Sequence, residues 1–229
     1  MTYRRALIVG AGAGLSAALA RRFAREGLAV ALAARSPEKL AALCAETGAR
    51  ALACDAADPV QVAALFAALD ADGAPDLVVY NASSRLRGPI AELDPASVQR
   101  SLQVSAFGAF LVAQQAARRM LKQRHGAIAL TGATAWVKGF ALSAPFAMGK
   151  FALRGLAQSL ARELAPQGIH VVHVVIDGGI RAGHRPDPAD APDSTLDPDA
   201  IAASYWHVLT QHRSAWSWEI EVRPWVERF

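Results

Sequence analysis

Three glycines at alternate positions, Gly10, Gly12 and Gly14, stand between an apolar run and an alanine-rich amphipathic stretch. The pattern predicts a strand that ends at Val9, a tight turn, and a helix that begins at Leu15. Glycine lets a diphosphate approach the backbone, where the free N–H groups and positive dipole end of the next helix attract anions. An ordinary turn can carry the same glycines, but the position between strand and helix favours a nucleotide site formed by this turn and Leu15.

Polar residues at the ends of the next two predicted strands indicate which nucleotide binds. Proteins that select the unphosphorylated dinucleotide usually place an acid after the second strand, but here the chain reads Arg35-Ser36. An arginine can bind a 2′-phosphate through a bidentate, charge-assisted contact, and Ser36 can add a hydrogen bond. Asp55, after the third strand, could bind an adenine amino group or simply cap a helix. We therefore expect NADP(H) as the preferred cofactor, with NAD(H) possible.

The elements that must position these residues alternate along the chain. We expect strands at residues 5–9, 29–33, 49–54, 77–80, 127–131, 169–176 and 219–222. We expect helices at residues 15–26, 37–47, 59–70, 95–123, 146–165 and 198–211. Four of these helices begin with proline after a residue that can cap free N–H groups, namely Ser36, Asp58, Asp94 and Asp197. The alternation predicts an α/β fold: a single-domain Rossmann-type doubly wound parallel sheet over residues 1–229, with helices on both faces.

Composition narrows the class of protein. The 229 residues are 53% hydrophobic and 19% charged, which suits one domain with a large core. Lysine and arginine exceed acids by 24 − 20 = 4, but the basic residues are scattered, so we expect no nucleic-acid partner. Glycines interrupt the N-terminal apolar run, so we expect no signal peptide, no membrane partner and a cytoplasmic location.

One segment breaks the alternation. Residues 181–199 are rich in proline and aspartate and poor in apolar side chains, so we expect an exposed loop near the carboxyl end of a strand. Ligands of open α/β sheets bind at that end. The loop is either a mobile lid over a small-molecule substrate or a solvated connection.

Taken together, these motifs resemble the short-chain dehydrogenase/reductase family over nearly the full chain. Residues 10–16 resemble its glycine-rich turn, with Ser16 where the last glycine is expected. Tyr80-Asn81-Ala82-Ser83 resembles its Asn-Asn-Ala-Gly segment, which implies that Asn81 lies at the cofactor. Asp177-Gly178-Gly179-Ile180 stands where the family has Pro-Gly and a backbone contact to the nicotinamide carboxamide, here assigned to Ile180.

The resemblance fails at the catalytic residues. The family uses a Tyr-x-x-x-Lys pair on one helix, but this chain reads Phe146-Ala-Met-Gly-Lys150. The family serine about thirteen residues earlier corresponds to Ala133, next to Thr134, and the family asparagine corresponds to Ser105. Only the lysine remains, and the resemblance implies that it holds the nicotinamide ribose.

Phenylalanine cannot give the proton that carbonyl reduction requires, and general acid catalysis contributes roughly 10²–10⁴-fold. Three interpretations remain, with Lys150, Thr134 and Phe146 as the catalytic-site residues. An NADP-dependent oxidoreductase could act on an iminium or activated C=C, or it could reduce a carbonyl with Thr134, Ser143 or Tyr205 as donor. Alternatively, the chain is an inactive NADP(H)-binding relative with a regulatory or structural role. We favour an enzyme with a non-standard active site.

Other residues suggest packing and assembly. His170 and His173 are three apart in a strand, which places them on opposite faces, so we expect no metal site. Trp216 and Trp218 are expected on one strand face, in the core or at a subunit contact. Small residues along residues 95–123 and 146–165 permit close helix packing. By family resemblance, they predict a homodimer or homotetramer.

Overall fold

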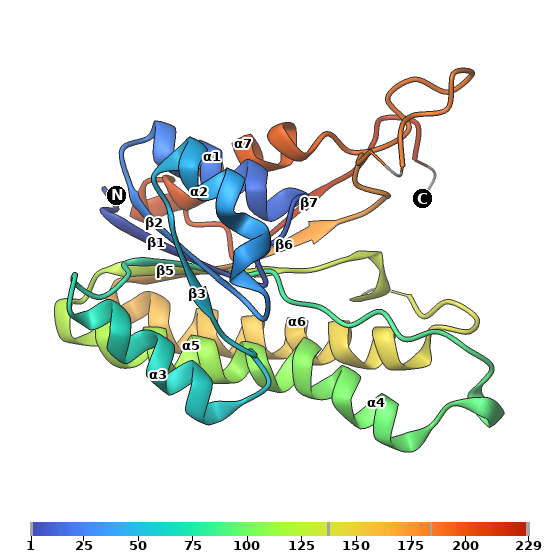
Figure 1. Cartoon of the computed structure of the whole chain (residues 1–229), viewed down its shortest axis with the longest axis horizontal. Coiled ribbons are helices and arrows are strands. Elements are labelled where there is room, and N and C mark those ends of the chain that lie inside the picture. The colour runs from blue at the N-terminus through green and yellow to red at the C-terminus, as the bar shows by residue number, and fades with distance from the viewer. Residues whose placement is uncertain (1, 137, 184, 228–229) are drawn as a thin grey trace.

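The computed structural model describes residues 2–136, 138–183 and 185–227, and within them the chain forms one parallel sheet between two helical layers (Figure 1). The strands are β1 (Arg5–Val9), β2 (Ala29–Ala34), β3 (Arg50–Ala53), β4 (Leu77–Tyr80), β5 (Gly126–Thr131), β6 (Ile169–Ile176) and β7 (Glu219–Val222). Their order is β3-β2-β1-β4-β5-β6-β7, and neighbouring strands pair in parallel. This confirms the predicted doubly wound sheet.

The helices divide between the two faces. The first face is covered by α1 (Leu15–Arg25), α2 (Ala41–Thr47) and α7 (Pro198–Leu209), and the second by α3 (Pro59–Asp70), α5 (Gly108–Gln123) and α6 (Ala144–Leu164) (Figure 1). A shorter helix, α4 (Pro95–Leu102), precedes α5. Side chains alternate along β1: Ala6 and Ile8 join the core under α1, whereas Leu7 and Val9 join the core under α3 and α5. Both faces are buried, as parallel sheets require.

The topology determines where a ligand can bind. The chain runs outward from β1 to β2 and β3, then returns to β4 on the other side of β1. The connections therefore diverge between β1 and β4, and a crevice opens beyond the carboxyl ends of these strands. The predicted glycine turn follows β1, and Asn81 follows β4.

Local interactions agree with most predicted helix starts. The side chains of Asp58, Asp94 and Asp197 accept hydrogen bonds from backbone N–H groups in the first turns of α3, α4 and α7. Ser36 makes no such bond, because its segment opens with a 3₁₀ turn at Pro37–Leu40 before α2. The prediction of a capping Ser36 was therefore wrong.

Two further sequence predictions need correction. The expected helix at residues 95–123 is divided by a π-helical turn at Gln103–Phe107. The two tryptophans do not share a face. The Trp216 ring stacks on His170, with ring centroids 4.7 Å apart. Trp218 instead packs against the core under α3, α5 and α6, and the Arg154 guanidinium lies over its ring. Both precede β7, so the alternation of a regular strand does not apply to them.

Candidate functional site

Two adjoining cavities occupy the crevice at the carboxyl ends of the strands. The first, the glycine crevice, has a volume of about 370 Å³ and is lined by residues that include Gly10, Arg35 and Asp55. The second, the arginine pocket, has a volume of about 600 Å³ and is lined by residues that include Lys150 and three arginines. Asn81 and Ser83 line both cavities, so the two form one continuous site.

Gly10 is required by the backbone of the turn. Its φ is +84°, and a Cβ atom there would lie 2.3 Å from the backbone nitrogen of Ala82. The N–H groups of Gly10 and Ala11 both donate to the carbonyl of Ala33, which joins the ends of β1 and β2. Only glycine fits this position, because it must adopt a left-handed conformation against the chain that follows β4.

Gly12 and Gly14, unlike Gly10, have no neighbouring atoms that would exclude a side chain. A Cβ atom on either residue would meet nothing within 4 Å, so both positions face open space, outside the linings of the two cavities. The Leu15 side chain is buried in the core, which leaves its backbone as the part that can face a ligand. The first turn of α1 has no acidic side chain, so its positive dipole end is not offset by a nearby carboxylate of that helix. The turn can therefore receive a diphosphate.

Ser16 links the turn to the next strand. Its buried hydroxyl donates to the carbonyl of Gly10 at 3.1 Å and accepts from Nδ2 of Asn81 at 2.8 Å. A glycine at this position could make neither bond. Sequence reasoning noted Ser16 as a departure from the family turn but did not predict that it holds Asn81 in place.

The remaining predicted cofactor residues lie around these two cavities. Arg35 is exposed at the rim of the glycine crevice, whereas Ser36 is next to it and outside the lining. Asp55 lines the crevice and accepts from the N–H of Ala57 through Oδ1, so it also stabilises the local turn. Ile180 lines the arginine pocket instead. Of the predicted cofactor residues, the two linings thus contain Gly10, Arg35, Asp55, Asn81, Lys150 and Ile180, whereas Gly12, Gly14, Leu15 and Ser36 lie outside both linings.

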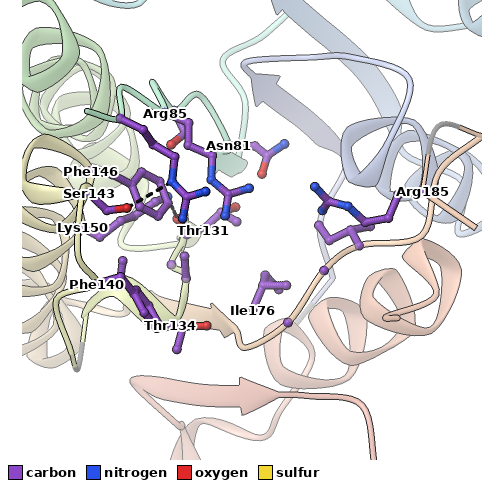
Figure 2. Close-up of a pocket in the computed structure, with 18 residues that line it drawn as sticks. Asn81, Arg85, Thr131, Thr134, Phe140, Ser143, Phe146, Lys150, Ile176 and Arg185 are labelled. Atoms are coloured by element: carbon purple, nitrogen blue, oxygen red, sulfur yellow. Dashed lines mark hydrogen bonds between the residues drawn. The ribbon is translucent and has the colours of Figure 1, made fainter. Parts of the chain in front are cut away.

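The arginine pocket contains Phe146 and Lys150, one turn apart on α6 (Figure 2). The Lys150 ammonium donates to the carbonyl of Thr131 at 2.8 Å and lies 5.8 Å from the centre of the Phe146 ring. Burial lowers the pKa of Lys150 from its usual 10.5 to about 8. An amine with such a pKa can hold or release a proton near neutral pH.

The three candidate proton donors differ in their surroundings. Thr134 lines the pocket, but its hydroxyl donates to Asp177. Ser143 also lines the pocket and accepts from Nε of Arg87 at 3.1 Å. Tyr205 does not line the pocket: it is fully buried, its hydroxyl pairs with Thr131 Oγ1 at 2.8 Å, and burial raises its pKa. Tyr205 as a donor was therefore a wrong prediction.

The π-helical turn at Gln103–Phe107 positions Ser105. The Ser105 hydroxyl accepts from the N–H of Ser84 at 3.1 Å, next to residues that line the cavities. The Tyr80 hydroxyl donates to the carbonyl of Val104, within the same turn. A π turn displaces backbone groups from the regular helical pattern and often occurs at functional sites. Helical periodicity alone gave no indication of it.

Three arginines were not predicted as site residues. Arg85 and Arg87 come from the loop after β4, and Arg185 comes from the loop after β6. Figure 2 shows Arg85 and Arg185 extending toward the cavity from opposite sides. The guanidinium of Arg85 lies 5.4 Å from the centre of the Phe146 ring, a distance typical of a cation–π contact. The sequence held one indication of this arrangement: both loops follow strands that lie next to β5, and the carboxyl ends of parallel strands lie at the same edge of the sheet.

Two other features, a group of metal ligands and a membrane-spanning helix, are absent from the described residues. Among residues 2–136, 138–183 and 185–227, no group of three metal-ligating side chains occurs. No helix in the described part of the chain combines the length and apolar character needed to span a membrane.

Comparisons with known proteins identify the class. Residues 4–186 match the model of the short chain dehydrogenase family, so the chain belongs to that family of oxidoreductases, as the resemblance implied. A short-chain dehydrogenase from Rhodopseudomonas palustris has a similar solved structure, with a TM-score of 0.85 and 35% identity over 97% of this chain and 99% of that chain. A metagenomic short-chain oxidoreductase in complex with NADP has a TM-score of 0.84 and 29% identity, covering 96% and 97%.

One curated relative is named for nucleotide binding and not for a reaction. The cyclic-di-GMP-binding biofilm dispersal mediator protein of Escherichia coli (strain K12) is 33% identical over 190 residues, which cover 81% of this chain and 76% of the relative. Similarity at this level is thus found both with an oxidoreductase that binds NADP and with a protein named for binding another nucleotide.

The residues present fit a nicotinamide dinucleotide. The left-handed Gly10, the two open glycines and the adjoining cavities leave space for an extended ligand with a central diphosphate. Arg35 lines the glycine crevice and Lys150 lines the arginine pocket. Each of the two cavities therefore contains a cation, in addition to the backbone N–H groups of the turn.

Proposed function

We propose that the protein is an NADP(H)-dependent oxidoreductase that transfers hydride to an activated C=C, C=N or carbonyl group without the usual tyrosine acid. The observation that supports this most is the continuity of the glycine crevice with the pocket that holds Lys150. A cofactor that enters along the glycine turn has its reducing end beside Lys150 and Phe146. When bound, it supplies hydride.

The chain's own residues would divide the remaining tasks. Arg35 would bind the 2′-phosphate, which favours NADP(H) over NAD(H), and the NADP complex of the metagenomic relative agrees with that choice. Lys150 would hold the nicotinamide ribose through its ammonium donors. Phe146, at the position of the family tyrosine, would pack against the substrate.

Phe146 restricts the substrate. A simple ketone needs a proton on oxygen as hydride arrives at carbon, and a phenyl ring has none to give. Thr134 is a poor replacement because its proton is directed to Asp177. A substrate activated by conjugation delocalises the incoming negative charge, so a proton from water or from the Lys150 ammonium can follow later.

A second function class is a cofactor-binding protein without turnover. It is favoured by the change of three polar catalytic residues of the family, the tyrosine, serine and asparagine, to Phe146, Ala133 and Ser105. The name of the Escherichia coli relative also points to a binding role in that protein. The same crevice would then serve as a sensor for NADP(H).

One set of measurements separates these functions. We expect NADPH to bind in calorimetry and to be oxidised in the presence of activated enones, imines or carbonyls. Tight binding without oxidation across the panel would favour the second class. Phe146→Tyr should raise the reduction of simple ketones by about 10-fold or more, since general acids contribute roughly 10²–10⁴-fold. Phe151→Tyr is the control, because Phe151 is exposed on α6 and outside the pocket lining.

We also propose that the chain acts as a homodimer or homotetramer in the cytoplasm. Phe107 and Phe110 are both exposed and stacked, with ring centroids 6.1 Å apart. A second copy would cover these rings. Light scattering at micromolar concentration should give the mass of at least two chains, and the mass of one chain would contradict the proposal.

A further inference from the structure

The charge of the arginine pocket differs from that of the whole chain. The sequence has 24 basic residues against 20 acids, yet the pocket lining includes Arg85, Arg87, Arg185 and Lys150 and no aspartate or glutamate. A cavity with several cations and no lining carboxylate has a positive potential, which attracts anions.

The three guanidinium groups are not neutralised by neighbouring acids. In the described part of the chain, none of the three forms an ion pair, whereas Arg181 in the same loop as Arg185 pairs with both Asp187 and Asp197. Among the described residues, the Arg87 guanidinium donates to the neutral hydroxyl of Ser143. Aspartates are thus available in the loop but contact Arg181, and Arg185 is left facing the pocket.

The arginines are also close enough to affect one another. Partial burial, together with the positive charges of Arg87 and Arg185, lowers the pKa of Arg85. Repulsion between neighbouring positive charges without a counter-ion raises the free energy of the folded chain, and a bound anion would lower it. Arginine suits this role because its planar fork matches the oxygens of a carboxylate or phosphate.

We infer that the substrate carries an anionic oxygen group, a carboxylate or a phosphate, which binds between Arg85, Arg87 and Arg185 at the mouth of the pocket. This inference rests on the proposed function and narrows it. A cationic iminium would be repelled by the same three side chains, so an activated C=C or carbonyl is the better match among the proposed substrates. The arginines would also stabilise negative charge that develops as hydride is accepted.

The experiment compares trans-benzoylacrylate with its methyl ester, which share the reducible group and differ in charge. Binding to the NADP⁺-loaded protein is measured by calorimetry. We expect the acid to bind at least about 10-fold more tightly than the ester, which equals about 1.4 kcal/mol. Arg85→Gln and Arg185→Gln should each remove most of this difference while NADP⁺ affinity is unchanged.

Arg100→Gln is the matched control. Arg100 is an exposed residue of α4 beside Asp94, outside both cavities, and its substitution removes the same charge. It should leave the preference for the acid unchanged. Phenyl phosphate as a competitor distinguishes the two anion sources: stronger binding than the acid indicates a phosphate-bearing substrate, and weaker binding indicates a carboxylate.

The outcomes separate this inference from the proposed function. Equal affinity for acid and ester, binding of neither compound, or an equal effect of Arg100→Gln would overturn the anion site. A clear preference for the acid without any NADPH oxidation would support the anion site and contradict the oxidoreductase.

Discussion

The glycine crevice and the arginine pocket form one continuous site, but they are built in different ways. The crevice depends mainly on backbone geometry: the left-handed Gly10 packs against the chain after β4, and the open Gly12 and Gly14 follow in the same turn. One part-buried hydrogen bond between the side chains of Ser16 and Asn81 joins this turn to the chain after β4. The pocket is built from side chains on a helix and two loops, with exposed arginines at its mouth. Backbone geometry permits few substitutions, whereas side chains on loops can change the chemistry without changing the fold. Cofactor binding and reaction type are thus separable in this molecule.

The largest expected effect concerns the backbone of the crevice. Gly10→Ala places a Cβ atom 2.3 Å from the Ala82 nitrogen and forces alanine to a φ of +84°. We expect a loss of roughly 2–4 kcal/mol in the free energy of unfolding, because steric strain and an unfavourable backbone conformation add. Denaturant unfolding of the ligand-free wild type and variant measures this difference in unfolding free energy.

Gly12→Ala is the matched control for this prediction. A Cβ atom there meets nothing within 4 Å, so the ligand-free protein should unfold at nearly the same denaturant concentration as the wild type. Its NADPH affinity should nevertheless fall, because the methyl group would occupy the approach of the diphosphate. Equal unfolding of both variants would contradict the distinction between a structural and a ligand-facing glycine.

The next prediction concerns the buried amine of the pocket. Burial lowers the pKa of Lys150 to about 8, so between about pH 8 and 10 the unfolded chain holds a proton that the folded chain has lost. Stability therefore rises with pH in this range. Relative to Lys150→Met, the wild type should gain about 2 kcal/mol in unfolding free energy from about pH 8 to pH 10. A difference that stays constant with pH would show that the amine is not desolvated.

A smaller effect is expected at the rim of the crevice. Arg35→Ala should weaken NADPH binding by about 10-fold and leave NADH binding nearly unchanged, since a hydrogen bond to a charged group contributes roughly 1.5–3 kcal/mol and this side chain is exposed. Calorimetric titrations with both dinucleotides provide the measurement, with Arg100→Gln as the control. An equal loss for both dinucleotides would remove the basis for the NADP(H) preference.

The sequence predicted the framework because local signals agreed with the overall topology. The bounds of β1, β4, β6 and β7 were predicted to the residue. The first three strands are mostly apolar, whereas β7 alternates glutamate with isoleucine and valine. Glycine spacing likewise indicated the turn after β1. These features depend on neighbours in sequence, which periodicity and turn chemistry report directly.

The rest depended on contacts between distant residues. Arg85 and Arg185 line the same cavity because their loops leave strands on either side of β5, and no motif surrounds either residue. The π turn at Gln103–Phe107 depends on tertiary partners such as Tyr80, which bonds to the carbonyl of Val104. The error at Tyr205 has the same origin: a hydroxyl in the sequence says nothing about the face of the sheet to which its helix packs.

Hydride transfer itself tests the central claim most directly. NADPH deuterated at the nicotinamide C4 would be incubated with the protein and trans-benzoylacrylate, and the reduced product analysed by mass spectrometry. The account predicts one deuterium on carbon in the product, at a rate that falls when Lys150 is replaced by methionine. Bound NADPH with no deuterium in any product would show that the crevice holds a dinucleotide for a purpose other than catalysis.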